Sequence, residues 1–154
     1  MVGVAPRRPF TPRPYNIAMI EHQLEHRRGA TWAGMGLGKT VSSLNAMLTR
    51  ELVDGAFPAL VLGPARVAES TWSGEAAKWE HLHAVRVLPV VGDPGQRKAQ
   101  LARPGEIYTL SYDNLPWLLE TLDGRWPFRT VYPDESTKLK NLRISNQVSS
   151  KGKE

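Results

Sequence analysis

The feature that most constrains the fold is a glycine-rich octapeptide, Ala33-Gly34-Met35-Gly36-Leu37-Gly38-Lys39-Thr40. Glycines at 36 and 38 let the backbone turn tightly, so that successive N–H groups and the positive end of a following helix can face one anion. Lys39 would then reach the β- and γ-phosphates of a nucleotide, and the Thr40 hydroxyl would bind Mg²⁺. The octapeptide therefore predicts a phosphate-binding loop that opens a helix.

The residues around the loop support this interpretation. The general pattern G-x-x-x-x-G-K-[ST] has glycine where this chain has Ala33, a known variant. A chance glycine-rich turn is the alternative, but an apolar run at 30–32 predicts a strand before the loop. After the loop, apolar residues recur at helical spacing up to about Leu52. The dinucleotide fingerprint G-x-G-x-x-G is excluded, because its third glycine falls on Lys39 or Val41.

Composition favours one intracellular globular domain. The chain has 154 residues, of which 41% are hydrophobic, enough for one core and too few for two comfortable domains. It has no cysteine, which excludes disulfides and thiolate zinc sites and suits a reducing cytoplasm. We expect no membrane partner, because no apolar run approaches about 18 residues. The net charge of +5 is compatible with a polyanion partner without requiring one.

Apolar periodicity and turn residues predict alternating helices and strands. A Pro- and Arg-rich extended segment, residues 1–13, comes first and is expected to be partly disordered. Helices are expected over 15–28, ending at Gly29 with an apolar stripe against the sheet, and over 39–52, 67–81, 96–102 and 115–122. Strands are expected over 59–62, 85–91, 107–110 and 130–132. This alternation is typical of a mainly parallel, doubly wound α/β sheet, which binds ligands at the carboxyl ends of its strands.

Asp134 and Glu135 are candidates for the acidic groups that nucleotide hydrolysis needs in addition to a phosphate-binding loop. Hydrolysis requires a carboxylate to hold Mg²⁺ and a group that orients the attacking water. The pair follows an apolar run and lies 95 residues after Lys39 (134 minus 39), which leaves room for the chain to return beside the loop. Asp134 would hold Mg²⁺ through a water, and Glu135 would polarise the nucleophile. Pro133 cannot donate to a strand ladder, so the strand should end there.

Five stretches resemble, in order and spacing, the first RecA-like lobe of superfamily 2 helicases, above all the Snf type with its phage members. They span residues 33–40, 61–66, 72–79, 110–115 and 134–141. The W-x-x-E-x-x-K-W and D-E-x-x-x-x-K-N stretches are rather specific to that branch. The similarity covers about residues 14–145 and leaves a basic tail, 146–154. It implies ATP and Mg²⁺ as cofactors, nucleic acid as partner, with DNA favoured over RNA, and the host-cell cytoplasm as location if the chain is viral.

The resemblance also implies roles for individual residues. Asn16 stands where the family often has an adenine-reading glutamine, and the loop from Gly34 to Thr40 would bind the phosphates. The catalytic residues would be Lys39, Asp134 and Glu135, with Thr40 and Asp134 at the metal. The nucleic-acid backbone would be contacted by Pro64, Ala65, Arg66 and Tyr112. For Arg66 the alternative is a structural role, as a helix cap or as a partner of Glu69.

The sequence lacks parts that such a motor needs. Only 19 residues follow Glu135 (154 minus 135), too few for the strand of the third motif, the rest of this lobe, and a second lobe with its arginine finger. We therefore expect very weak turnover, and either marginal stability or association with a second protein that supplies the missing lobe. Three functions stay open: a lobe of an ATP-driven translocase, a non-hydrolysing nucleotide- and nucleic-acid-binding module, and a small-molecule phosphotransferase.

Several other side chains have a plain alternative to a functional role. His22 and His26 have metal-ligand spacing but no visible third ligand, so a solvated helix face is favoured, and His81 and His83 are likewise expected at the surface. Trp72 and Trp79 could stack on bases, but their helical spacing with Ala76 favours the core. A basic run near the C-terminus either contacts nucleic acid or is solvated; it comprises Lys138, Lys140, Arg143, Lys151 and Lys153.

Overall fold

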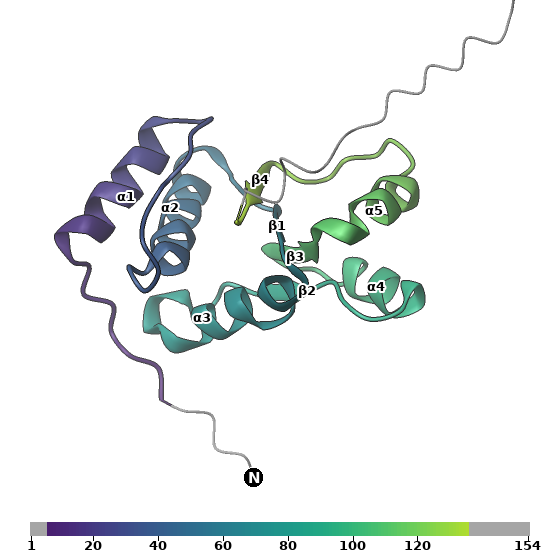
Figure 1. Cartoon of the computed structure of the whole chain (residues 1–154), viewed down its shortest axis with the longest axis horizontal. Helices are drawn as coiled ribbons and strands as arrows, with labels where there is room; N and C mark the ends of the chain where they lie inside the picture. The colour runs from purple at the N-terminus through teal and green to yellow at the C-terminus, as the bar shows by residue number, and fades with distance from the viewer. Residues whose placement is uncertain (1–5, 136–154) are drawn as a thin grey trace, which may run out of the picture.

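The computed structural model describes residues 6–135, and within that range the chain forms five α-helices and four β-strands (Figure 1). In chain order these are α1 Pro14–Glu25, α2 Lys39–Asp54, β1 Ala59–Gly63, α3 Trp72–Lys78, β2 Val87–Pro89, α4 Pro94–Leu101, β3 Ile107–Ser111, α5 Leu115–Leu122 and β4 Thr130–Pro133. Short helical turns occur at Val67–Thr71, Glu80–Leu82 and Tyr112–Asn114. Within the described part, no helix is long and apolar enough to cross a membrane.

The four strands form one parallel sheet in the order β2-β3-β1-β4. Ile107 of β3 lies opposite both Ala59 of β1 and Val87 of β2, and Ala59 also lies opposite Thr130 of β4. Because all four strands point the same way, their carboxyl ends meet at one edge of the sheet. This confirms the predicted parallel α/β fold.

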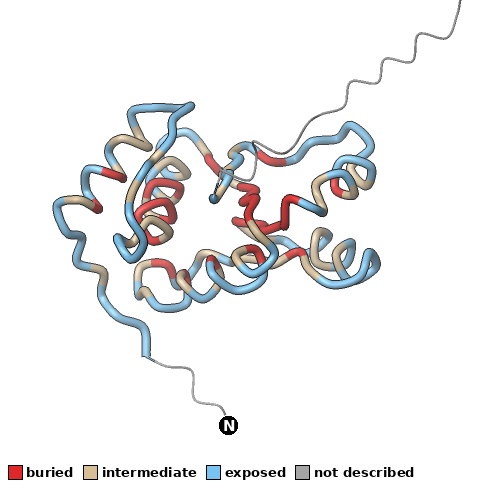
Figure 2. The backbone as a smooth tube through the Cα atoms, in the orientation of Figure 1, coloured by how far each residue is buried: buried red, intermediate tan, exposed pale blue. Residues whose placement is uncertain are grey.

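Helices cover both faces of the sheet, as the doubly wound prediction requires. Figure 1 shows α2 and α3 on one side of the strands and α4 and α5 on the other. On the first face, Leu44 of α2 and Trp72 of α3 pack with Val61 of β1. On the second face, Leu118 of α5 packs with Leu60 of β1. The buried residues therefore concentrate on the inner strands and on the helix surfaces that face them (Figure 2).

The first helix differs from its prediction in length and in packing. α1 ends at Glu25 rather than near Gly29, because His26 adopts extended backbone with φ −111° and ψ 107°. It packs mainly against α2, and the Tyr132 hydroxyl of β4 donates a hydrogen bond to its Gln23 side chain. Asn16 and Met19 are its buried residues, whereas Ile17 of the predicted apolar stripe is 43% exposed. The polar anchor at Asn16, described below, sets which face of the helix is turned inward.

The strand predicted at residues 30–32 is not formed. These residues have no regular secondary structure, and Trp32 is 77% exposed. A β-strand exists only through hydrogen bonds to a neighbour, and residues 30–32 are not hydrogen-bonded into the described sheet. The apolar run therefore reaches the glycine-rich loop as an irregular connection.

Other boundaries shift for local reasons. The helix predicted over 67–81 is divided into a short π-helical turn, α3 and a 3₁₀ turn, although Trp72 and Ala76 are buried as expected. β2 is shorter than the predicted strand and spans Val87–Pro89. The apolar stripe predicted for α2 is not buried along its whole length, because its last residue, Leu52, is 82% exposed. β4 does end at Pro133, as predicted.

The N-terminal segment is held in place over its described part, against the prediction of partial disorder. The Arg8 N–H donates to the carbonyl of Lys78 at 2.8 Å, and the Arg8 carbonyl accepts from Glu80 at 3.0 Å. The Phe10 ring contacts Trp79 edge to face at a centroid distance of 5.1 Å. It also stacks on His81, so His81 is partly covered, and burial lowers the pKa of that imidazole.

Candidate functional site

The glycine-rich loop has the backbone that its sequence predicts. Gly36 and Gly38 have φ values of 78° and 68°, the left-handed region that glycine adopts without strain. A Cβ atom at position 38 would also lie 3.0 Å from the amide nitrogen of Asn16. Ala33 is outside the left-handed region, which explains why alanine can replace the first glycine of the general pattern. The loop leads directly into the first turn of α2 at Lys39.

Asn16 braces this loop from α1. Its amide nitrogen donates to the Leu37 carbonyl and to the Ser42 hydroxyl, both at 3.1 Å, and its amide oxygen accepts from the Arg13 N–H at 3.0 Å. The side chain is buried and its amide group is already bonded at both ends. Asn16 is not among the residues that line the main cavity. The structure thus places Asn16 behind the glycine-rich loop, where it holds the loop and the start of α2 in place, and does not bring it to the cavity.

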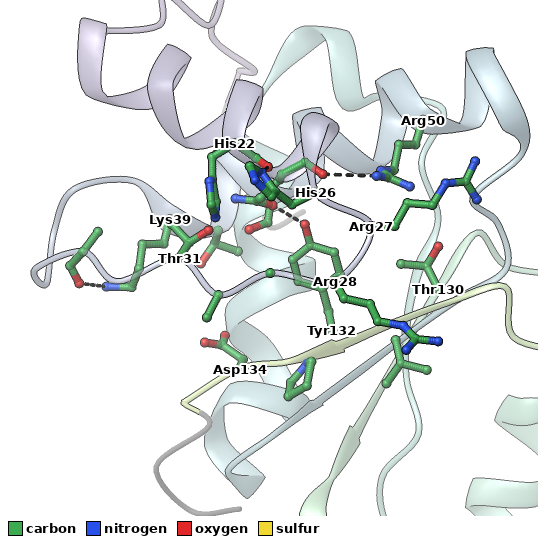
Figure 3. A pocket seen from close by; sticks show the side chains of 18 of the residues that line it. His22, His26, Arg27, Arg28, Thr31, Lys39, Arg50, Thr130, Tyr132 and Asp134 are labelled. Atoms are coloured by element: carbon green, nitrogen blue, oxygen red, sulfur yellow. Dashed lines mark hydrogen bonds between the residues drawn. The ribbon is translucent and has the colours of Figure 1, made fainter.

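Lys39 folds back over its own loop. The ammonium group donates to the carbonyl oxygens of Ala33 and Gly34 at 2.8 and 2.9 Å (Figure 3). Both acceptors are neutral, and an ionised phosphate oxygen makes a stronger hydrogen bond to an ammonium group than a carbonyl does. Lys39 can therefore exchange these carbonyls for phosphate without leaving the loop. Thr40 follows it in the chain and also lines the cavity.

Asp134 is held in place by three other parts of the chain. Its N–H donates to the Leu62 carbonyl of β1 at 2.7 Å. Its carboxylate oxygen Oδ2 accepts from Trp72 Nε1 at 2.9 Å, and its carbonyl accepts from the Tyr112 hydroxyl at 2.7 Å. Glu135 has a φ of 52° and donates its N–H to Asp134 Oδ1 at 2.9 Å. The acid pair therefore forms a fixed turn at the carboxyl end of β4.

Two of these anchoring roles were not visible in the sequence. Tyr112 was expected to contact nucleic acid, but its side chain is buried and its hydroxyl is bonded to Asp134. Burial, and then the charges of Asp134 and Glu135, raise the pKa of Tyr112 to about 12. Trp72 was expected in the core, where it lies, but its indole N–H also bonds the acid. Only a general rule could have indicated the Trp72 bond from the sequence: the indole N–H of a buried tryptophan usually has a hydrogen-bond acceptor.

One cavity of about 640 Å³ joins the loop and the acid pair (Figure 3). Lys39 and Thr40 line it from one side, and Asp134 and Glu135 line it from the end of β4. The cavity continues between residues 29–33 and the open edge of β4. The structure thus brings together side chains that are 95 residues apart in the sequence.

The lining of the cavity is strongly cationic, which suits a polyphosphate. Besides Lys39, its charged residues are Arg27, Arg28, Arg50 and Arg129, against the two carboxylates of the acid pair, and His22 and His26 also line it. Some of this charge is neutralised, because Asp54 lies 2.8 Å from an Arg27 nitrogen. The two histidines stack at a centroid distance of 4.4 Å. No cluster of three possible metal-binding side chains occurs in residues 6–135, so the histidines have no third ligand there.

The residues predicted to contact nucleic acid follow β1 at the carboxyl edge. Ala65 and Arg66 are exposed and Pro64 is half-buried. Arg66 has helical backbone and makes no side-chain capping bond, and no ion pair with Glu69 occurs in the described chain. Neither structural alternative for Arg66 is therefore present. Residues 136–141 of the acidic box, the tail 146–154 and the five basic residues from Lys138 to Lys153 lie outside the described residues.

Comparison with known proteins adds one relative. The chain is 46% identical over 137 residues to protein p41 of Acyrthosiphon pisum secondary endosymbiont phage 1. The aligned region covers 88% of this chain and 30% of p41, so the chain spans less than a third of that relative's length. No family model matches the chain. The comparison therefore links the chain to a phage protein without assigning an activity.

Proposed function

We propose that this chain binds Mg·ATP as the first RecA-like lobe of a Snf-type superfamily 2 motor that acts on nucleic acid, with DNA favoured over RNA. One observation carries the proposal: Lys39 and Thr40 share a cavity with Asp134 and Glu135. A phosphate loop alone would bind a nucleotide, whereas a loop facing an acid pair has the parts needed for metal-assisted hydrolysis. The cationic lining of the cavity supports the same ligand.

The residues fit Mg·ATP in distinct roles. The left-handed glycines leave the loop open to phosphate oxygens, and Lys39 exchanges two neutral carbonyls for them. Thr40 and Asp134 would hold Mg²⁺, which neutralises charge on the phosphates. Because Trp72 already bonds one carboxylate oxygen of Asp134, a water between that carboxylate and the ion suits the geometry. Glu135, which is exposed beside it, would orient the attacking water.

Turnover by the chain alone should be very low. An arginine finger from a second lobe can contribute about 10³ to 10⁵ in rate, and residues 6–135 form a single lobe built on one sheet. We therefore propose that a further polypeptide, a second lobe or a second protein, completes the motor. The open edge of β4 favours this, because its outer side has no strand neighbour among residues 6–135. In isolation, the chain would act as a nucleotide- and nucleic-acid-binding module.

Binding of a fluorescent ATP analogue tests the nucleotide assignment. Lys39→Ala should lower the affinity at least tenfold, because the loop loses its charge-assisted contact to phosphate. Lys98→Ala, an exposed lysine of α4, is the matched control and should bind like the wild type. Equal affinity in the Lys39→Ala protein would contradict the proposal. ATP turnover that depends on a metabolite and ignores DNA would instead indicate a phosphotransferase.

A further inference from the structure

Arg97 lies at the carboxyl edge of the sheet, away from the nucleotide cavity. It belongs to the first turns of α4, which begins at Pro94 soon after β2 ends. Asn114 and Trp117 lie at the start of α5, directly after β3. All three residues therefore lie at the β2–β3 end of the edge, whereas the acid pair follows β4 at its other end.

The guanidinium group of Arg97 is fixed in one orientation. Its central carbon lies 4.5 Å from the centre of the Trp117 ring, a cation–π contact. Its Nη1 atom donates to the side-chain oxygen of Asn114, and the Asn114 amide in turn donates to the Ser111 hydroxyl at 2.8 Å. An arginine held in this way loses little conformational freedom when it binds an anion.

This cation has no counter-charge in the described chain. The ion pairs found in residues 6–135 involve Arg27, Arg50, Lys78 and Arg86, and none of them includes Arg97. The Nε atom is buried and has no hydrogen-bond acceptor. The nearby Asp93 carboxylate is occupied as the N-cap of α4, where it accepts from the Gln96 N–H. A half-buried, oriented and unneutralised guanidinium is a site that favours an anionic ligand.

The position of Arg97 indicates which anion it meets. Arg66 follows β1, and β1 and β2 are separated by β3. Neighbouring strands lie about 4.8 Å apart, so the two strand ends lie roughly 10 Å apart along the edge. Arg66 is exposed and Arg97 is half-buried, so two cations follow strands at the same edge of the sheet, which suits a polyanion that runs along this edge better than a single small anion.

We propose that Arg97 contacts a backbone phosphate of nucleic acid, so that the strand runs along the carboxyl edge from β1 across β3 to β2. The inference rests on the proposed nucleic-acid partner and deepens it by giving the path of the backbone. Trp117 and Asn114 are positioning residues in this site, because they orient the guanidinium group. The nucleotide would occupy the opposite end of the same edge, beneath β4.

Salt-dependent binding of labelled single-stranded and duplex DNA of mixed sequence tests the site in the full chain. Arg97→Gln removes the charge but keeps a polar group for Asn114. The slope of log affinity against log salt should become shallower by about 0.9 for duplex and about 0.7 for single-stranded DNA, one phosphate contact in each case. Binding of the ATP analogue should not change. Arg103→Gln is the matched control, because Arg103 is exposed and precedes β3 at the opposite edge; it should keep the wild-type slope.

Each result has a defined meaning. Failure of the wild type to bind DNA would overturn both the nucleic-acid partner and this inference. Wild-type binding whose slope falls in Arg66→Ala but not in Arg97→Gln would overturn the Arg97 site alone. If Arg97→Gln does not fold, Arg97→Lys decides: it keeps the charge but loses the planar fork. A several-fold loss of affinity at an unchanged slope would support the site, and wild-type affinity would overturn it.

Discussion

β1 and β4 lie side by side in one sheet, yet they are stabilised differently. β1 has a neighbour on each side and all five of its residues are buried. β4 is hydrogen-bonded on one side, and its residues alternate between half-buried and exposed, with Val131 41% exposed. β1 is therefore fixed by burial, whereas the acid pair after β4 is fixed by hydrogen bonds from Trp72 and Tyr112. The site depends on a few polar contacts at the less covered side of the fold.

The largest expected effect is on the free energy of unfolding, which should fall much more when a side chain of β1 is replaced by alanine than when one of β4 is. Leu60→Ala removes a fully buried side chain of β1 and should lower the free energy of unfolding by about 2 to 5 kcal/mol. Val131→Ala in β4 should cost about 0.5 kcal/mol or less, because the side chain is substantially exposed. Urea denaturation of both variants measures the difference. Similar losses would show that β4 is as tightly packed as β1.

Removal of the hydrogen bonds to Asp134 should have an intermediate effect. Trp72→Phe keeps an aromatic ring in the core but leaves Asp134 Oδ2 without its donor, which should cost about 1 to 3 kcal/mol. Tyr112→Phe removes the bond to the Asp134 carbonyl and should cost about 1 kcal/mol. Both variants should also weaken the Mg²⁺-dependent part of ATP-analogue binding. Unchanged Mg²⁺ dependence in both would mean that these contacts do not position the acid pair.

A smaller effect should appear in alkaline solution. Burial raises the pKa values of Tyr112 and Tyr132 to about 12, above the value near 10 of an unfolded tyrosine. The unfolded chain therefore loses these protons first, so the contribution to stability is complete below pH 10 and falls as the pH rises to about 12. Ultraviolet titration should show late-ionising tyrosines, fewer in Tyr112→Phe and Tyr132→Phe. Ionisation of all four tyrosines near pH 10 in the folded protein would contradict these environments.

The same contrast explains what the sequence could reveal. Strands β1 and β3 and helix α5 were predicted within about a residue, because their apolar runs are clearly delimited, as by Pro58 directly before β1. The loop glycines and the acid pair were found from motif spacing alone. Each of these signals is local, so it survives without knowledge of the tertiary fold.

Features that depend on tertiary contacts were not predictable. The run at 30–32 reads as a strand, but a strand needs a paired neighbour. The stripe of α1 suggested packing on the sheet, whereas the buried amide of Asn16 ties the helix to the loop and to α2. The motif around Tyr112 predicted a contact with nucleic acid. Only the hydrogen bond from its hydroxyl to the Asp134 carbonyl shows that it supports the acid pair.

The central claim is that the glycine-rich loop and the acid pair form one Mg·nucleotide site. The most direct test measures ATP-analogue affinity with and without Mg²⁺ in the wild type, Lys39→Ala, Asp134→Ala and the double variant. We predict that Mg²⁺ strengthens wild-type binding, that Asp134→Ala removes this enhancement, and that the two substitutions are not additive because both act on one ligand. Full Mg²⁺ enhancement in Asp134→Ala, with additive effects in the double variant, would contradict the claim.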